Sequence, residues 1–74
     1  MKSIEIFKTN VSGKRNARYL IGEMNALFPN HKISINLNDS DKVLRIENRK
    51  GPVKTKEIMQ LLERRNFRCE VLNY

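Results

Sequence analysis

Apolar and polar residues alternate over residues 3–8, which read SIEIFK. Successive side chains of a strand point to opposite faces of a sheet, so this alternation predicts a half-buried β-strand. We expect Ile4 and Ile6 to face the core. Glu5 and Phe7 are then expected to lie away from that face or at the strand end.

Two further alternating segments lie on either side of a short polar turn. Residues 32–38 read KISINLN and residues 42–48 read KVLRIEN, with the turn sequence NDSD at residues 38–41. This arrangement predicts an antiparallel hairpin. The residues expected to face the core are Ile33, Ile35, Leu37, Leu44 and Ile46, and those expected to face out are Val43, Arg45 and Glu47.

Apolar residues at intervals of three and four predict two helices. In the first helix they fall at positions 17, 20, 21, 24, 27 and 28. We expect Asn10 or Ser12 to cap its start, and the Pro-Asn pair at residues 29–30 to end it. The second helix is expected over residues 53–65, with Asn66 as a left-handed C-cap. Its expected core residues are Val53, Ile58, Leu61 and Leu62, with Met59 at the margin.

The last segment, residues 67–74, is expected to be a fourth strand with Cys69 and Val71 inward and Leu72 outward. The order strand, helix, strand, strand, helix, strand is the split βαβ arrangement. It predicts an α+β, ferredoxin-like fold, in which a four-stranded antiparallel sheet carries two helices on one face. Right-handed crossovers place the first and third strands at the centre. We expect one domain covering residues 1–74.

Charge and cysteine content limit the expected class of partner and the expected cellular compartment. Fifteen Lys and Arg residues against eight Asp and Glu residues give a net charge of +7. This excess favours an acidic protein, nucleic acid or anionic lipid as partner. A lone cysteine forms no internal disulfide, and no apolar run is long enough for a signal peptide or a membrane span. We therefore expect a cytoplasmic protein.

The segments LIGEMNALFPN, DKVLRIE and EIMQLLERRNFRCEVL resemble parts of the heavy-metal-associated domain. This is the fold of copper chaperones and of the metal-binding repeats in metal-pumping ATPases. The likeness covers residues 4–72 and lies in the pattern of core positions. It is nearest to a variant without a metal site in small bacterial proteins that share an FKTNV opening. The resemblance implies the same ferredoxin-like fold.

The metal ligands of that family are missing from this sequence. The family binds metal through a Cys-x-x-Cys motif between the first strand and the first helix, and such soft thiolates suit Cu(I) or Zn. The equivalent residues 9–16 read TNVSGKRN, with Asn10 and Gly13 at the cysteine spacing. We expect His31 to be a solvated loop residue and Cys69 a buried apolar residue, both far from this loop. The sequence therefore predicts no metal and no cofactor.

Metal chaperones of this family dock onto partner domains through the loop and first helix, aided by complementary charge. The resemblance therefore implies a protein-binding surface for an acidic partner here. Its expected residues are Thr9, Asn10, Ser12, Lys14, Arg15 and Arg18. A second basic group is expected on an exposed sheet face or edge, formed by Arg45, Arg49 and Arg68. Outward Val43 and Leu72 with Phe7 would form an apolar patch there, so we expect a monomer or a weak homodimer.

Two other functions are compatible with parts of the sequence. The free amides of the first helix start, beside Lys14 and Arg15, favour an anion or nucleic acid. RNA-recognition motifs share the strand order, but they stack bases on aromatic residues of the first and third strands. The segment KVLRIEN contains no aromatic residue, so nucleic acid is the less favoured partner.

Catalysis is the least favoured function. Acylphosphatases share the strand order and use an Arg and an Asn, roles that Arg15 and Asn10 would take here. The chain lacks that family's loop pattern, and its sequence shows no triad or paired-carboxylate arrangement. Asp39 and Asp41 are expected to be turn formers. We therefore expect a binding protein and not an enzyme.

Overall fold

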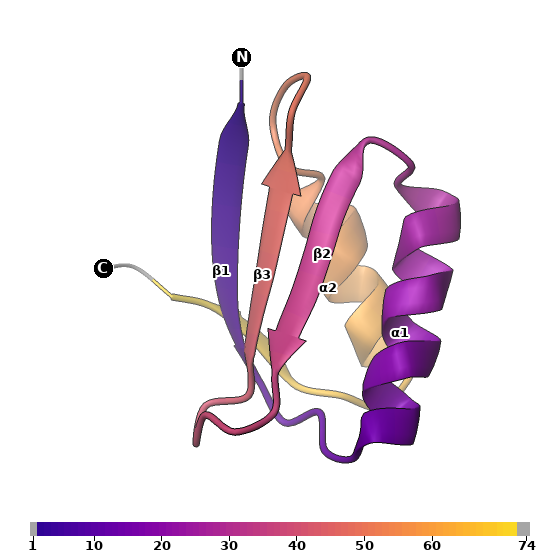
Figure 1. Cartoon of the computed structure of the whole chain (residues 1–74), viewed down its shortest axis with the longest axis vertical. Helices are drawn as coiled ribbons and strands as arrows, with labels where there is room; N and C mark the ends of the chain where they lie inside the picture. Colours follow the sequence, from indigo (N-terminus) through magenta and orange to yellow (C-terminus); the bar gives the residue numbers. More distant parts are fainter. Residues whose placement is uncertain (1, 73–74) are drawn as a thin grey trace.

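The computed structural model describes residues 2–72 (Figure 1). The elements along the chain are β1 (Ser3–Thr9), α1 (Lys14–Leu27), β2 (His31–Asn36), β3 (Val43–Asn48), α2 (Thr55–Arg64) and β4 (Cys69–Val71). The four strands form one antiparallel sheet, and both helices pack on the same face of it. The α+β, ferredoxin-like fold expected from the sequence is confirmed.

The strand order in the sheet is β2-β3-β1-β4, so β1 and β3 are the central strands, as right-handed crossovers predict. Phe7 of β1 lies opposite Leu44 of β3 and Val71 of β4. His31 of β2 lies opposite Asn48 of β3. The start of β2 and the end of β3 therefore share one end of the sheet, while α1 begins near the other end (Figure 1).

A single apolar core lies between the sheet and the two helices. Its largest fully buried side chains are Phe7, Val11, Leu20, Met24, Leu44, Ile46, Ile58 and Leu62. The expected inner residues of β3 and α2 are confirmed, although Val53 precedes the helix, which begins at Thr55. The expected stripe on α1 is wrong at Leu27, which is 57% exposed. Phe28, which was also expected in the stripe, does pack against the core.

The structure contradicts the expected orientation of β1. Phe7 is fully buried, whereas Ile4 is 40% exposed and Ile6 is only half-buried. The reason lies in Lys8, which shares a face with the two isoleucines and would be buried with them in the expected orientation. Burying an unpaired ammonium group is costly. In the observed orientation Lys8 is exposed and pairs with Asp41 at 3.6 Å.

Hydrogen bonds hold the end of β1 to the turn between β2 and β3. The Thr9 N–H donates to the Asp41 carbonyl (3.0 Å), and the Thr9 hydroxyl donates to the Lys42 carbonyl (2.6 Å). The same hydroxyl accepts the Val11 N–H at 3.3 Å. Within the turn the Asp41 N–H donates to Asp39 Oδ1 (2.8 Å), which confirms the turn-forming role of Asp39.

The start of α1 differs from the expected cap. Gly13 is the N-cap residue, with φ of 85°, a conformation that glycine adopts without steric cost. No side chain caps the first amides, so the expected caps Asn10 and Ser12 are wrong. The Asn10 side-chain oxygen instead accepts the Arg68 N–H at 2.7 Å.

The end of α2 matches the expectation. Asn66 adopts the left-handed conformation with φ of 66°, and the Phe67 N–H donates to the Leu62 carbonyl (2.9 Å). The last strand is shorter than expected: β4 covers only Cys69–Val71. The first and last residues of this strand pack against the core, as expected. Residues 73–74, also expected in this strand, lie outside the described residues.

Candidate functional site

The expected docking surface has a structural part and an exposed part. Thr9 is buried, and its hydroxyl is engaged by both Lys42 and Val11. The Asn10 side-chain oxygen is engaged by the Arg68 N–H. These two residues therefore support the loop through internal hydrogen bonds. The side chains left free to meet a partner are those of Ser12 and of the three cations that follow.

Lys14, Arg15 and Arg18 form an exposed cationic group at the start of α1. Their spacing of three and four places Arg18 beside both of the others on the helix surface. Residues 10–22 contain no Asp or Glu. Within the described chain, none of the ion pairs includes these three cations. We call Lys14, Arg15 and Arg18 the α1 basic surface.

This surface opposes the helix dipole. The positive end of the dipole is at the N-terminus of a helix, so acidic residues are favoured there and cations at the other end. The first turn of α2 contains Glu57 and its last turn contains Arg64, which follows the rule. The first turn of α1 contains no acidic residue and begins with Lys14 and Arg15. The same chain therefore obeys the rule in one helix and breaks it in the other.

An exposed aromatic ring adjoins the α1 basic surface. Tyr19 is 60% exposed, and the Arg65 guanidinium lies 5.8 Å from its ring centroid. Arg65 also donates two hydrogen bonds to the Glu23 carboxylate, one of them at 2.9 Å from Nε. This pairing holds the pKa of Glu23 below its usual value. Because the Glu23 carboxylate is paired with Arg65, it does not offset the positive charge of the α1 basic surface.

The three arginines of the second basic group are not close together. Arg45 and Arg49 share the carboxylate of Glu47, at 3.4 Å and 3.9 Å. Arg68 lies at the other end of the sheet, where its N–H meets Asn10. Arg45 and Arg49 therefore carry a net charge of +1 with Glu47, and Arg68 belongs to the end of the molecule where α1 begins.

The residues on the open face of the sheet differ from those expected to form an apolar patch there. Phe7 does not belong to it, because Phe7 is buried under the helices. Ile4 and Ile6 lie on the open face instead, opposite Glu47 and Arg45 of β3, because the face of β1 is reversed. The Leu72 N–H donates to the Ile6 carbonyl at 2.8 Å, which brings these two residues together.

Cys69 lies opposite Thr9, nearer to the first loop than expected, because β1 and β4 are neighbouring antiparallel strands. Its thiol is half-buried. Burial, followed by the negative charge of Glu63, raises the pKa of Cys69 to about 11.

The described residues, 2–72, contain no cluster of three or more His, Cys, Asp or Glu side chains that could hold a metal ion.

The raised pKa predicts an unreactive thiol. At pH 8 a pKa of about 11 leaves roughly 0.1% of Cys69 as thiolate, the form that attacks alkylating reagents. We expect iodoacetamide to modify the native protein roughly 100-fold more slowly than the urea-unfolded chain. Mass spectrometry of timed samples measures both rates, and equal rates would contradict the buried position of the thiol.

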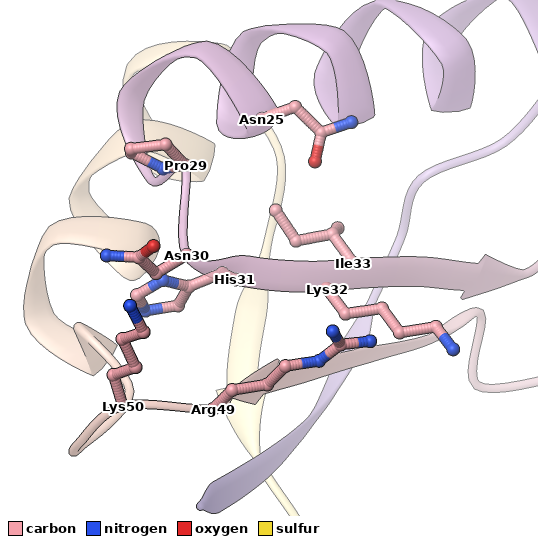
Figure 2. Close-up of a pocket in the computed structure, with 8 residues that line it drawn as sticks. All are labelled: Asn25, Pro29, Asn30, His31, Lys32, Ile33, Arg49 and Lys50. Carbon is pink, nitrogen blue, oxygen red and sulfur yellow. The ribbon is translucent and has the colours of Figure 1, made fainter.

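A hollow at the start of β2 (Figure 2) lies at the opposite end of the molecule from the start of α1 (Figure 1). Its volume is about 580 Å³. Its lining residues are Asn25, Pro29, Asn30, His31, Lys32, Ile33, Arg49 and Lys50. The basic pairs His31-Lys32 and Arg49-Lys50 come together because β2 begins where β3 ends. This site was not predicted from the sequence, although the two pairs stand at the start of one predicted strand and just after the other.

His31 occupies a different environment from the one expected. It is the first residue of β2 and is half-buried, with its ring 5.5 Å from that of Phe28. The Lys54 N–H donates to His31 Nε2 at 3.4 Å. The other nitrogen, Nδ1, is buried and has no hydrogen-bond partner among the described residues. Burial, followed by the charge of Lys54, lowers the pKa of His31 below its usual value.

Comparisons with known proteins give no match to a family model, a curated protein or a solved structure. Within residues 2–72, neither helix combines the length and the apolar content that a membrane crossing requires.

Proposed function

We propose that the protein is a non-catalytic binding module that docks an acidic protein partner through the α1 basic surface. The observation that carries this proposal is the group of three exposed cations at the wrong end of a helix dipole, with no carboxylate among residues 10–22. Complementary charge of this kind accelerates association and selects the partner. The heavy-metal-associated domains that the sequence resembles use the corresponding loop and helix to dock.

Two features besides charge support a protein partner. Tyr19 lies exposed beside the cations, and tyrosine and arginine are the residues that most often dominate protein interfaces. Gly22 is exposed on α1, and a Cβ added there would meet nothing within 4 Å, so no contact inside the chain requires glycine. Glycine inside a helix costs about 1 kcal/mol relative to alanine. A partner that approaches the helix backbone closely would account for it.

Charge reversal tests the docking proposal. The variant Lys14→Glu/Arg15→Glu is expected to lower the recovery of acidic proteins in affinity capture from a cell extract by at least about tenfold at low salt. The matched control is Lys56→Glu/Arg64→Glu, which changes the net charge equally at two exposed positions of α2. Mass spectrometry identifies the captured proteins. Equal recovery by both variants would contradict the proposal.

The same variant separates docking from folding. Carboxylates at a helix start interact favourably with the dipole, so Lys14→Glu/Arg15→Glu is expected to leave the protein as stable as before or slightly more stable. Thermal unfolding followed by circular dichroism measures this.

Nucleic acid is the alternative partner. If duplex DNA of arbitrary sequence binds with a salt-dependent affinity that falls equally in both variants, the cations act only through non-specific attraction.

A further inference from the structure

The hollow at the start of β2 has the lining of an anion site. Lys32, Arg49 and Lys50 supply three cationic groups, while Asn25 and Asn30 supply side-chain amides. No carboxylate lines the hollow. The one acidic residue in contact with these cations is Glu47, which reaches Arg49 at 3.9 Å from outside the lining. An anion there would meet no negatively charged side chain in the lining.

The lining is held in place by contacts that do not use its charged groups. The Asn48 side chain accepts the Lys50 N–H (3.0 Å) and donates to the Pro52 carbonyl (2.7 Å), which fixes the loop after β3. The His31 N–H donates to the Phe28 carbonyl at 3.0 Å. The cationic side chains therefore extend from a fixed backbone, and a fixed backbone lowers the entropy cost of binding.

His31 lines the hollow and has one ring nitrogen without a hydrogen-bond partner among the described residues. Because Nε2 accepts the Lys54 N–H, the proton of the neutral ring is on Nδ1. Nδ1 is also the buried atom without a partner in the described structure. A buried donor without an acceptor is unfavourable, and no hydrogen bond within the described residues holds this side of the His31 ring.

A second hollow of about 290 Å³ adjoins the first and shares Pro29, Asn30, His31 and Lys50 with it. The second hollow adds the apolar residues Leu27, Phe28 and Pro52, and one further cation, Lys54. The combined site has a cationic part and a part with apolar walls. Such a division fits a ligand with an anionic group and a small organic remainder, and the volumes are in the range of small-molecule sites.

We propose that the combined hollow binds the phosphoryl group of a small phosphorylated molecule. A phosphate group carries more than one negative charge and offers several acceptor oxygens, which matches the three cations and two side-chain amides of the lining. A nucleic acid strand fits this site less well, because binding of single strands relies on exposed aromatic rings for stacking. The nearest ring, Phe28, is half-buried and packs against His31.

Pyrophosphate is the probe for this site, used with the intact protein at low ionic strength. We expect saturable binding by isothermal titration calorimetry, and amide chemical-shift changes centred on Asn30, His31 and Lys50. The variant Arg49→Gln/Lys50→Gln is expected to weaken binding by at least about tenfold, because it removes two charged donors. The matched control Lys14→Gln/Arg15→Gln removes the same charge at the other end and is expected to weaken it less than about threefold.

Each other outcome overturns the proposal. Absence of saturable pyrophosphate binding by the unaltered protein would show that the hollow is not a phosphate-binding site. Equal weakening in the two double variants would show that binding depends on the net charge of the protein and not on this site. Binding of a short single-stranded oligonucleotide at these residues, without binding of pyrophosphate, reassigns the surface to nucleic acid. Circular dichroism of both variants checks that the fold is retained. The docking proposal is unaffected by any of these results, because it rests on other residues.

Discussion

Replacement of Phe7 by alanine is expected to lower the free energy of unfolding by about 3–5 kcal/mol. Phe7 is fully buried and lies between Leu44 and Val71 in the centre of the sheet, so truncation leaves a cavity that its neighbours fill only in part. A domain of this size has a total stability of about 4–11 kcal/mol. Phe7→Ala is therefore expected to lose a large share of the total stability, which urea titration at 25 °C measures.

The control for Phe7 is Ile4, the residue that the alternation in β1 assigned to the core. Ile4→Ala is expected to cost about 1 kcal/mol or less, because the side chain is already 40% exposed. Phe7→Leu keeps most of the buried volume and provides a folded variant of intermediate stability. If Ile4→Ala cost more than Phe7→Ala, the orientation of β1 described above would be wrong.

Thr9→Val is expected to cost about 1–3 kcal/mol although the two side chains have nearly the same shape. The substitution removes the hydroxyl that donates to the Lys42 carbonyl and accepts the Val11 N–H. Val11 is fully buried, so its N–H would lose its partner in a place that water does not reach. Chemical denaturation of the variant measures the loss.

Two matched substitutions separate the hydroxyl of Thr9 from other effects. Thr9→Ser keeps both hydrogen bonds and loses one methyl group, so it is expected to cost about 0.8 kcal/mol. Ser12→Ala, at an exposed position with no capping bond, is expected to lie within about 0.5 kcal/mol of the unaltered protein. A Thr9→Val variant as stable as Thr9→Ser would show that the hydroxyl bonds are unimportant.

The two proposed surfaces lie at opposite ends of the molecule and are tested independently. The α1 basic surface is convex and follows from helix spacing, while the hollow beside His31 exists only where two strands and two loops meet. A protein partner on α1 and a phosphorylated ligand at the start of β2 would not compete for the same residues. Pyrophosphate is therefore expected to leave the capture of an acidic partner unchanged.

The order of the elements and most of the core could be predicted from the sequence. The spacing of apolar residues in α2 and in the hairpin allows only one buried face, so Leu44, Ile46 and Leu62 were placed correctly. Asn66 was also recognised as a helix end, since its preference for the left-handed conformation depends on its own side chain. Apolar spacing and the conformational preference of a single residue are local properties, so they can be predicted directly from the sequence.

The candidate sites were predictable to different degrees. Lys14, Arg15 and Arg18 are neighbours on a helix, so spacing alone placed them on one surface. The hollow was missed because its cations come from segments 17 residues apart in the chain, Lys32 and Arg49, which meet only through strand pairing. The pairing of β4 with β1 placed Arg68 beside Asn10 and away from Arg45, although both arginines had been assigned to one basic group.

In β1 the sequence by itself left two faces open, because apolar residues stand at both even and odd positions: Ile4 and Ile6 on one side and Phe7 on the other. The tertiary structure decided between them through Lys8, whose charge needs solvent and Asp41, and through Thr9, whose hydroxyl needs the turn after β2. Periodicity determines which residues share a face. Which face is buried depends on the cost of desolvating every residue on it, and that cost is defined only once the partners are in place.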